Sequence, residues 1–568
     1  MQFKERLLLT VALCTPIFLF SQSVYLPPGS KHNHFIDRME ILQGKVADEN
    51  FTTTKPYNRR FVSRLSHAFD SLTRADVHKI SKQDEYNLIS LYRNNSEWFD
   101  GDESILKSKK PFLKSLYTTK ANFFEHKEKD LFIAINPVFQ YQFISADKDI
   151  NSLYLNSRGA SIRAVIGNKI GAYVSLWDNQ ERAPQFVRNW IDIYKAVPGA
   201  NFYKVFKTTG VDYFDGRGGI TFPVTKYIDV QLAYDKNFIG NGYRSLFLSD
   251  WGGNYFFLKL NTKIWKFNYQ NIFAELNPKF IRSGDYLLPK KYAAMHHLSI
   301  NLKKWLNIGA FESVVFGRTN QLELGYLNPL IFYRTIEGNI GSPDNVILGF
   351  DFKANFAKKF QLYGQLLIDE LNFKELRKDK TWWGNKFGFQ LGGKYINAFN
   401  ISNLDLQAEV NIVRPFTYSH YADITQNDFP VANYTHYNQP LAHPLGANFR
   451  EVIGIARWQP INKLFLLGKI IYSQQGLDSS NTSKNFGSNI FRANGERSGD
   501  YGYTLLAGLK ANIINASFLA SYEIKENVFF DFSLLIRNFD APIPLVSQNT
   551  KIISIGVRVN LARREYDF

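Results

Sequence analysis

Apolar and polar residues alternate along most of this chain, and the last such segment shows the pattern most clearly. Within residues 550–561 one face carries Ile553, Ile555, Val557, Val559 and Leu561, and the other carries Ser554, Gly556, Arg558 and Asn560. Successive side chains of a β-strand point to opposite faces, and a barrel strand in a membrane turns one face to lipid and the other to the lumen. The pattern predicts a lipid-facing strand; the alternative is the last strand of a soluble β protein.

The N-terminus has the organisation of a secretory signal. Lys4 and Arg6 precede an apolar stretch from Leu7 to Phe20, and small and polar residues follow. This stretch is shorter than the about 20 residues that a transmembrane helix needs. We therefore predict a signal peptide over residues 1–22. The only cysteine, Cys14, lies inside it after Leu13, where a lipoprotein signal has a small residue, so we expect neither lipidation nor disulfides.

Composition restricts how the mature chain could cross a membrane. Hydrophobic residues make up 45% of the chain, and the mean hydropathy is −0.25. No segment after residue 22 has the continuous apolar run of a transmembrane helix, and only helices and closed barrels satisfy the backbone in lipid. Aromatic residues, at 16%, suit the girdles at the two membrane interfaces. We predict an all-β barrel in the cell outer membrane of a Gram-negative bacterium.

The chain is basic, with a net charge of +17. Such a surface attracts anionic partners, and charge alone does not choose among acidic polysaccharide, lipopolysaccharide and nucleic acid. An exported chain meets little nucleic acid, and no nucleic-acid-binding motif is found in the sequence. Anionic polysaccharide and the phosphates of outer-membrane lipopolysaccharide are the partners that we expect. The alternative is that the basic residues only line loops and barrel rims.

The chain divides once. Residues 23–130, the leader, have helix and loop character, whereas residues 131–568 have strand and turn character. Phe61, Leu65, Phe69 and Leu72 recur at helical spacing, and Ser81 has the character of a second helix start. We expect the leader to form a helical cap that faces the periplasm or plugs a barrel mouth.

The second part predicts a large antiparallel barrel. At about 22 to 27 residues per strand with its turn, residues 131–568 give roughly 16 to 20 strands. Asp405, Gln407, Glu409 and Asn411 share a face that we assign to the lumen, and Gly167-Asn168 marks a tight hairpin turn. Short turns indicate the periplasmic side. The long segments 418–449 and 474–501 are expected to be external loops that bind a partner or are disordered.

Several stretches carry a family resemblance. In this order along the chain, four blocks resemble the capsule assembly Wzi family: residues 235–249, residues 328–334 with 342–351, residues 362–371, and residues 439–448. Residues 25–30 and 35–42 are similar to the leaders of Bacteroidetes-type members, whose relatives in gliding bacteria are gliding motility proteins of the RemB type. The resemblance implies an outer-membrane barrel of about 18 strands. It also implies that the barrel's own loops and helices plug it, and that it anchors capsular polysaccharide at the cell surface.

Charged residues in these blocks suggest a network. Asp369 and Glu370 are adjacent, so a strand turns them to opposite faces, and they do not form an acid pair. A basic barrel supplies arginine partners to whichever acid points inward. We expect a lumenal salt-bridge network that holds a plug; the alternative is direct contact with polysaccharide. The assigned residues are Arg318, Arg334, Glu337, Asp344, Asp369, Glu370, Arg414 and His420.

No catalytic or cofactor motif is found in the sequence. Gly-x-Ser-x-Gly, His-Glu-x-x-His and a phosphate-binding Gly-Lys-Ser are all missing. His420, His436 and His443 are spaced by 16 and 7 residues, which matches no standard metal-ligand pattern, so we expect solvated loop histidines. The chain is therefore predicted to be a non-enzymatic protein without metal or cofactor.

The end of the chain resembles the insertion signal of outer-membrane barrels. Gly556, Val559 and Leu561, followed by the final Phe568, fit the pattern that the barrel-assembly machinery recognises. Two other functions stay open beside capsule attachment. One is an open porin or channel, and the other is a structural partner of a secretion or motility complex that docks through the leader.

Overall fold

The computed structural model describes residues 23–47, 51–75, 80–150, 152–278, 287–318, 323–330, 332–421, 431–478, 484–542 and 548–568. The predicted signal peptide, residues 1–22, lies outside the described residues. Parts of both predicted external loops, residues 422–430 and 479–483, lie outside them as well.

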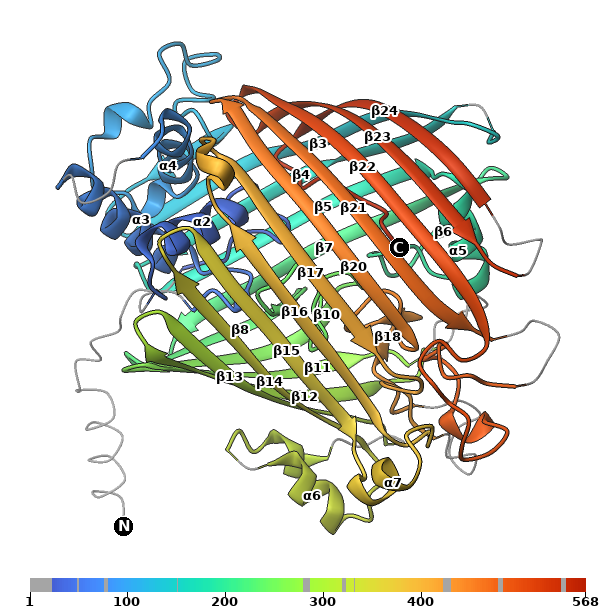
Figure 1. The fold of residues 1–568 in the computed structure, drawn as a ribbon. Coiled ribbons are helices and arrows are strands. Elements are labelled where there is room, and N and C mark those ends of the chain that lie inside the picture. The colour runs from blue at the N-terminus through green and yellow to red at the C-terminus, as the bar shows by residue number, and fades with distance from the viewer. Residues whose placement is uncertain are drawn as a thin grey trace, which may run out of the picture.

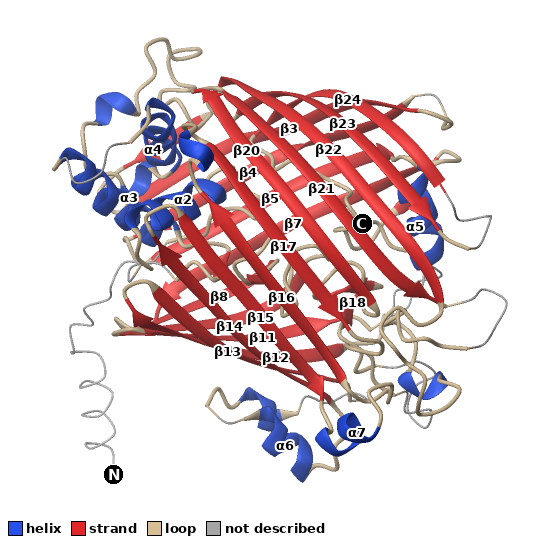
Figure 2. Ribbon diagram, in the orientation of Figure 1, coloured by secondary structure: helices blue, strands red, loops and turns tan. Residues whose placement is uncertain are grey.

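Eighteen antiparallel strands of the described chain close into a barrel (Figures 1 and 2). Each wall strand pairs with the next along the chain, and β24 pairs with β3 to close the wall, from Ile552↔Ala146 to Val559↔Phe139. The predicted fold class is therefore confirmed, with a strand number inside the predicted range. The wall strands are β3 (Leu131–Ala146), β4 (Leu153–Ile166), β5 (Ile170–Arg182), β7 (Gly210–Pro223), β8 (Ile228–Asp235), β10 (Tyr255–Ile264), β11 (Phe267–Leu276), β12 (Lys291–Lys303), β13 (Leu306–Phe316), β14 (Asn345–Phe356), β15 (Phe360–Glu370), β16 (Lys386–Tyr395), β17 (Leu404–Val413), β20 (Phe449–Ile461), β21 (Leu464–Leu477), β22 (Leu509–Lys525), β23 (Val528–Asp540) and β24 (Gln548–Val559).

Shorter elements complete the fold. The strands β2 (Phe124–Lys127) and β6 (Lys204–Phe206) extend the wall beside β3 and β7, and two-residue strands form the pairs β1 (Thr54–Lys55) with β9 (Phe238–Ile239) and β18 (Thr435–His436) with β19 (Gln439–Pro440). The helices are α2 (Asn33–Gln43), α3 (Arg59–Arg74), α4 (Lys82–Asn94), α5 (Gln185–Tyr194), α6 (Tyr333–Asn339) and α7 (Phe373–Lys378). Single 3₁₀ turns lie at Ser96–Trp98, Glu103–Ile105, Leu324–Leu327, Ala398–Asn400 and Asn494–Glu496. Within the described ranges, no helix combines the length and the apolar character needed to cross a membrane.

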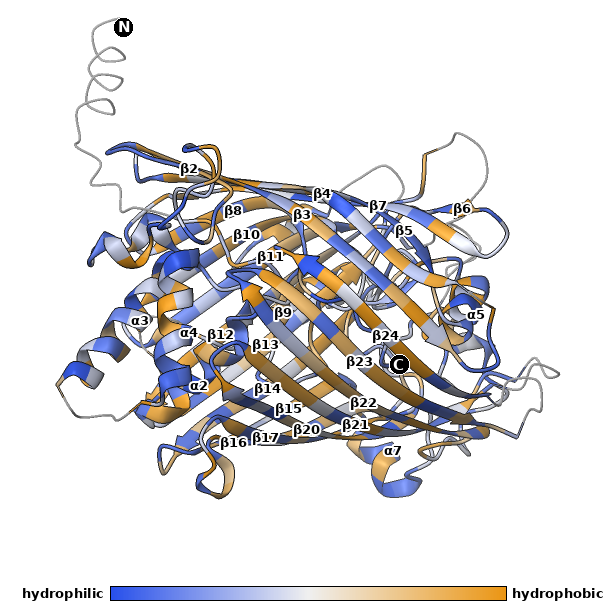
Figure 3. Ribbon diagram, turned by 90° about the horizontal axis from the view of Figure 1, so that it is seen from above, coloured by the Kyte–Doolittle hydropathy of each residue, from blue (hydrophilic) through white to orange (hydrophobic). Residues whose placement is uncertain are grey.

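The two faces of the wall follow the sequence alternation. In β17 the polar residues assigned to the lumen are buried, whereas the alternating Val410 is exposed on the outside. In β24, Ile553 and Ile555 are exposed and Ser554 is buried. Figure 3 shows apolar residues recurring along the wall strands. An apolar outer face with a polar inner face is the pattern of a barrel that meets lipid.

The two ends of the barrel differ. Tight turns join β4 to β5, β10 to β11, β12 to β13, β14 to β15, β20 to β21 and β22 to β23, all at one end, and the leader helices gather there (Figure 1). Gly167 and Asn168 in the first of these turns both have positive φ, which glycine and asparagine adopt most readily. The long connections, with α5, α6 and α7, lie at the other end. In outer-membrane barrels the short turns face the periplasm.

The leader is a small helical unit with its own core. The Asn58 side chain caps α3 by accepting from the backbone of Arg60, and the Ser81 hydroxyl accepts from Asp84 N and caps α4 at the predicted start. Leu65 and Phe69 of α3 are buried, as their helical spacing predicts. They pack with residues of α2 and α4 in one apolar cluster.

Helix α2 is fixed to the inner wall by ion pairs. Asp37 pairs with Lys394 of β16 at 2.7 Å, and Glu40 pairs with Lys353 of β14 at 2.8 Å. Arg38 joins Asp405 of β17 at 2.5 Å and Asp84 of α4 at 2.7 Å. Burial alone would raise the pKa of Asp37, but the ammonium groups of Lys394 and Lys55 hold it well below its usual range. Charges of the leader thus neutralise inward charges of three wall strands.

The chain itself fills the lumen at the end with the long connections. The β8–β10 connection (236–254) folds inward, and Leu246, Phe247 and Leu248 are fully buried there. Phe247 stacks on Phe311 of β13 at a ring distance of 4.8 Å. Residues of the β17–β20 connection, including Tyr418 and Tyr434, belong to the same apolar cluster. We call these two inward connections the plug.

Candidate functional site

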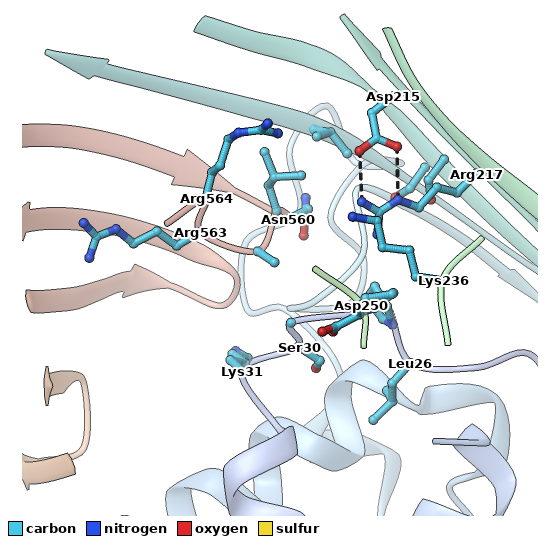
Figure 4. A pocket seen from close by; sticks show the side chains of 18 of the residues that line it. Leu26, Ser30, Lys31, Asp215, Arg217, Lys236, Asp250, Asn560, Arg563 and Arg564 are labelled. Carbon is cyan, nitrogen blue, oxygen red and sulfur yellow. Dashed lines mark hydrogen bonds and ion pairs between the residues drawn. The ribbon is translucent and has the colours of Figure 1, made fainter. Parts of the chain in front are cut away.

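A cavity of about 510 Å³ lies inside the barrel, between the wall and the segments that fill the lumen (Figure 4). Its lining comes from the inner faces of β3, β4, β5, β7 and β8, the first residues of the leader, the β8–β10 connection and residues 560–568. Small-ligand sites usually measure about 300 to 1,000 Å³ and lie in such enclosed places. This cavity is the candidate functional site.

Residues 560–568, which we call the tail, leave the wall after β24 and enter the lumen. The Asp567 carboxylate accepts from Arg244 at 3.1 Å, from Lys469 at 2.8 Å and from the Tyr243 hydroxyl. The Tyr566 hydroxyl donates to the Glu181 carboxylate at 2.7 Å. The tail therefore crosses the barrel interior and forms one side of the cavity.

The aromatic ring of Phe568 lies in an aromatic cluster. Its ring centroid is 5.9 Å from that of Phe186, 5.8 Å from that of Trp190 and 5.7 Å from that of Trp251. The Arg537 guanidinium donates to the carbonyl oxygen of Phe568 at 3.2 Å. Both apolar and charged contacts thus hold this end of the tail.

The tail acid Asp567 stays ionised despite its burial. Burial would raise its pKa, but the Arg244 guanidinium and the Lys469 ammonium hold it well below its usual range. A buried carboxylate with two cationic partners is costly to remove from its place, because each buried cation would lose its counter-charge.

The described lining of the cavity is rich in cations. It contains nine basic residues and five acidic ones. Arg217 is paired with Asp215 at 2.9 Å (Figure 4), and the Lys236 ammonium donates to the Gly199 carbonyl oxygen at 3.1 Å. The basic residues are Lys31, Arg59, Arg163, Arg217, Lys236, Arg244, Arg558, Arg563 and Arg564, and the acidic ones are Asp215, Asp235, Asp250, Glu565 and Asp567.

Arg563 is the cation with the weakest internal pairing that is evident in this lining. Its guanidinium meets the Glu565 carboxylate at 3.8 Å, a distance too long for a hydrogen bond. The lining also contains aromatic residues, among them Trp177 and Trp251. Guanidinium groups bind carboxylates in two-point geometry, and aromatic faces pack on apolar ligand surfaces. The cavity can therefore hold a polar, negatively charged ligand.

Four of the sequence-assigned network residues form two ion pairs, but not in the lumen. Arg318 binds Asp344 through two hydrogen bonds of 2.7 and 2.6 Å, and Arg334 pairs with Glu337 at 2.6 Å. All four belong to the β13–β14 connection, which folds over the outer face of the wall. Their assignment to a lumenal network is therefore corrected.

The adjacent acids of β15 share one partner. Asp369 is buried and pairs with Lys386 at 2.9 Å, while the more exposed Glu370 lies 3.3 Å from the same ammonium. Arg414, which we expected as an acid partner, donates instead to backbone carbonyl oxygens, including that of Asn385 at 2.7 Å. Only Asp369 has a buried side chain, as the alternation of strand side chains predicts. Its partner is a lysine, whereas we expected an arginine.

The expectation of solvated histidines is wrong for two of the three. His436 is buried, and its ring accepts from Asn277 N at 3.1 Å; His443 is buried and pairs with Glu451 at 2.8 Å. The reason is that the β17–β20 connection folds into the lumen. His420 is half-buried, and its backbone N donates to the Asn433 side chain at 2.5 Å.

The residues of the predicted insertion signal do not lie together on one strand. Gly556 and Val559 lie in β24, but Leu561 follows its end, and Phe568 lies in the lumen rather than on a lipid-facing strand. The expected terminal aromatic at the strand end is therefore corrected. Recognition of these residues by the barrel-assembly machinery stays a prediction.

Sequence reasoning missed the cavity residues Arg217, Lys236, Arg244, Arg563 and Asp567. One signal was present, since after Leu561 the stretch Ala562-Arg-Arg-Glu-Tyr-Asp-Phe568 no longer alternates. Four charged residues among seven are unfavourable in a strand that faces lipid. It could have indicated that the strand ends there and that the chain turns inward.

Comparisons with known proteins concern the fold. No protein-family model matches this chain. No curated protein matches it either. The structure of Wzi from Escherichia coli, described as an outer membrane protein involved in group 1 capsule assembly and a carbohydrate-binding β-barrel, superposes with a TM-score of 0.56 at 12% identity, over 96% of this chain and 100% of that one. This likeness shows a Wzi-like fold.

Two further solved structures overlap in part. OprD from Pseudomonas aeruginosa has a TM-score of 0.39 at 10% identity, over 75% of this chain and 94% of that one. OccAB2 from Acinetobacter baumannii has a TM-score of 0.41 at 8% identity, over 75% of this chain and 97% of that one.

Proposed function

We propose that this chain is a non-enzymatic outer-membrane barrel that binds anionic carbohydrate at the cell surface, in the assembly or attachment of capsular polysaccharide. The observation that carries the proposal is the cation-rich, aromatic-lined cavity inside a barrel whose lumen is filled by the chain itself. The whole-length fold likeness to a carbohydrate-binding barrel supports it.

The filled lumen argues for binding rather than transport. A porin of this size needs a continuous aqueous path, because barrels of 16 to 18 strands conduct when their interior is clear. Here the plug, the leader and the tail occupy the interior, and charged and apolar contacts fix each of them. An open porin remains the second candidate, since displacement of the plug, the leader and the tail together would leave a wide lumen.

The experiment uses the purified full-length barrel. Planar bilayers report its conductance, and a binding assay measures retention of acidic capsular polysaccharide from the source cells against a neutral polysaccharide of equal length. We expect a closed barrel that retains the acidic chain. Stable openings of nanosiemens size without binding would make the protein a channel and overturn the proposal.

A matched pair of variants tests the cavity. Arg563→Ala removes the weakly paired cation of the lining, whereas Lys148→Ala removes an exposed cation of the β3–β4 turn. We expect the first variant to weaken retention of the acidic polysaccharide several-fold, as loss of a charge-assisted contact does, and the second to leave it unchanged. Equal retention by both variants would place the carbohydrate elsewhere on the protein.

A further inference from the structure

Part of the outer face of the wall is covered, at the ends of β12, β13 and β14. Ile308, Glu312, Val314 and Phe316 share the outward face of β13, because strand side chains alternate. Ile308 is 36% exposed, yet Glu312 is only 4%, Val314 0% and Phe316 1% exposed. A segment on the outside of the barrel therefore covers the part of this face from Glu312 to Phe316, toward the end with the long connections.

The cover is the β13–β14 connection, whose described residues 323–330 and 332–344 we call the flap. The side chains of Tyr326 and Tyr333 are fully buried against Val314, Phe316 and other outward residues of β12 and β14. The Tyr326 ring lies 4.7 Å from that of Phe316. The flap thus packs on the outside of the wall as a core packs on a sheet.

Polar contacts fix the flap in this position. Asp344 accepts from Arg318 and, at 2.8 Å, from the Tyr326 hydroxyl, which ties the two ends of the connection together. The backbone N of Arg334 donates to the Glu312 carboxylate of β13 at 3.2 Å. The flap is therefore bound to the wall by specific bonds as well as by apolar contact.

Beneath the flap lies a polar row on what would otherwise be a lipid-facing surface. Asn271, His296 and Glu312 are direct neighbours across β11, β12 and β13, and all three are buried. The Tyr269 hydroxyl and the His296 ring are 2.6 Å apart. Polar groups exposed to the hydrocarbon layer are strongly unfavourable. The flap shields this row.

The flap also carries large apolar side chains that its contact with the wall leaves exposed. Leu324 is 73%, Leu330 83% and Phe332 70% exposed. These values exceed those of the neighbouring wall, where Phe350 of β14 is 53% exposed. Large exposed apolar side chains mark a surface that meets an apolar partner. The flap that carries them packs on the apolar outer surface of the wall.

We propose that the flap is embedded in the membrane, with Leu324, Leu330 and Phe332 inserted among the acyl chains of the outer leaflet. Lipid is the occupant because the flap lies on the outward face of the wall, beside residues that already face the bilayer. The flap would then be a membrane-inserted loop that widens the lipid contact and covers a polar row. This inference depends on insertion of the barrel in a bilayer and is independent of carbohydrate binding.

Site-specific fluorescence tests the proposal in the whole reconstituted barrel. Cys14 lies in the predicted signal peptide, so replacing it by Ser gives a cysteine-free background. Leu330→Cys, and separately Leu324→Cys, are labelled with an environment-sensitive dye in liposomes with and without brominated lipids. Ser498→Cys, an exposed polar position in the β21–β22 connection at the same end, is the matched control. Heat-modifiable migration on gels confirms that each variant is folded.

We expect blue-shifted emission at residues 324 and 330, and quenching by brominated lipids at least about two-fold stronger than at residue 498, because interfacial segments bury their apolar face in the acyl boundary. Water-like emission equal to that of the control would overturn the proposal. Blue-shifted emission without lipid quenching, together with cysteine cross-linking between barrels, would also overturn it, in favour of a second copy on the flap.

Discussion

At the residue scale, Glu409 shows which features strand alternation predicts and which it does not. Its position among alternating polar residues of β17 predicts an inward side chain, and it is buried in the lumen. Its carboxylate accepts from the backbone N of Tyr243 at 2.6 Å and of Arg244 at 3.1 Å, and from the Tyr363 hydroxyl at 2.9 Å. The alternation predicts the face, but the two backbone donors come from a connection about 165 residues earlier, which only the folded barrel brings there.

Asp567 ties the tail to two buried cations, Arg244 and Lys469. We expect Asp567→Asn to loosen the tail, because Arg244 and Lys469 then lose a buried counter-charge, and breaking a buried pair commonly costs about 3 to 5 kcal/mol. The measurement is the current of single barrels in planar bilayers, where the variant should show frequent brief openings.

The control for this prediction is Glu565→Gln. Glu565 also contacts Lys469 at 2.8 Å, but it is three times as exposed as Asp567, at 30% against 10% for the side chains. A more solvated pair contributes less. Equally frequent openings in both variants would show that the charge of Asp567 has no special role in holding the tail.

At the element scale, the leader is held at the tight-turn end by a cluster around Glu526, in the turn between β22 and β23. Lys31 of the leader pairs with Glu526 at 2.7 Å and with Glu523 at 2.5 Å, and Arg93 of α4 lies 3.3 Å from Glu526. Burial would raise the pKa of Glu526, but Lys31 lowers it to about 2. Burial lowers the pKa of Lys31, but the carboxylates of Glu526 and Glu523 raise it by more. The pKa of Lys31 is therefore above its usual value.

These pKa shifts give a pH window for leader docking. The depressed pKa of Glu526 contributes stability above about pH 4.3, the unfolded value, and this contribution is lost as pH falls toward about 2. The raised pKa of Lys31 contributes below about pH 10.4 and is lost only above it. We therefore expect the leader to stay protected from limited proteolysis between about pH 5 and pH 10, and to become cleavable as pH falls below about 4.

The variant Lys31→Ala tests the cause of this window. Without the ammonium, the burial of Glu526 raises its pKa, so protection of the leader should fail at a higher pH than in the parent protein. Lys45→Ala, in the same leader but without such a pair among its described contacts, should behave as the parent. Identical pH profiles for all three proteins would contradict the assignment to Lys31 and Glu526.

The tail is the second element whose removal should change a measurable property, the conductance of the barrel. Deleting residues 562–568 removes Asp567 and Phe568 and joins the cavity of about 510 Å³ to a smaller space of about 90 Å³ that the tail also lines. The plug and the leader remain, so we expect a small, steady conductance rather than a wide pore. Planar bilayers measure it. A conductance unchanged from the parent would show that the tail does not separate the two spaces.

At the scale of the whole molecule, closure of the wall depends only on residues 131–568. The pairing of β24 with β3 lies entirely within them, and β2 adds four residue pairs beside it. We therefore expect deletion of residues 23–130 to leave a heat-modifiable barrel in the outer membrane. Its thermal midpoint should fall, because Lys353, Lys394 and Asp405 lose their partners on α2.

Migration on gels before and after heating measures this outcome. Complete loss of the folded form would show that the leader is part of the barrel core rather than an inserted cap. A midpoint equal to that of the parent would show that the ion pairs of α2 do not contribute to barrel stability.

The sequence by itself determined the class of fold, the strand range and the inner and outer faces of the wall. These follow from a period of two residues and from the cost of unpaired backbone groups in lipid, both of which are local rules that each segment obeys alone. It also determined the helix start at Ser81 and the tight turn at Gly167-Asn168, because capping and positive φ depend on neighbouring residues only.

Only the tertiary structure decided where the connections go. The sequence does not distinguish a connection that folds into the lumen, such as residues 236–254, from one that folds outward over the wall, such as the flap. It likewise left the tail as a strand end, and assigned Arg318 and Asp344 to the lumen. Each of these placements depends on contacts between segments tens to hundreds of residues apart, such as Asp567 with Arg244 or Glu312 with Arg334. Such contacts form only in the folded barrel, so no local pattern identifies the partners.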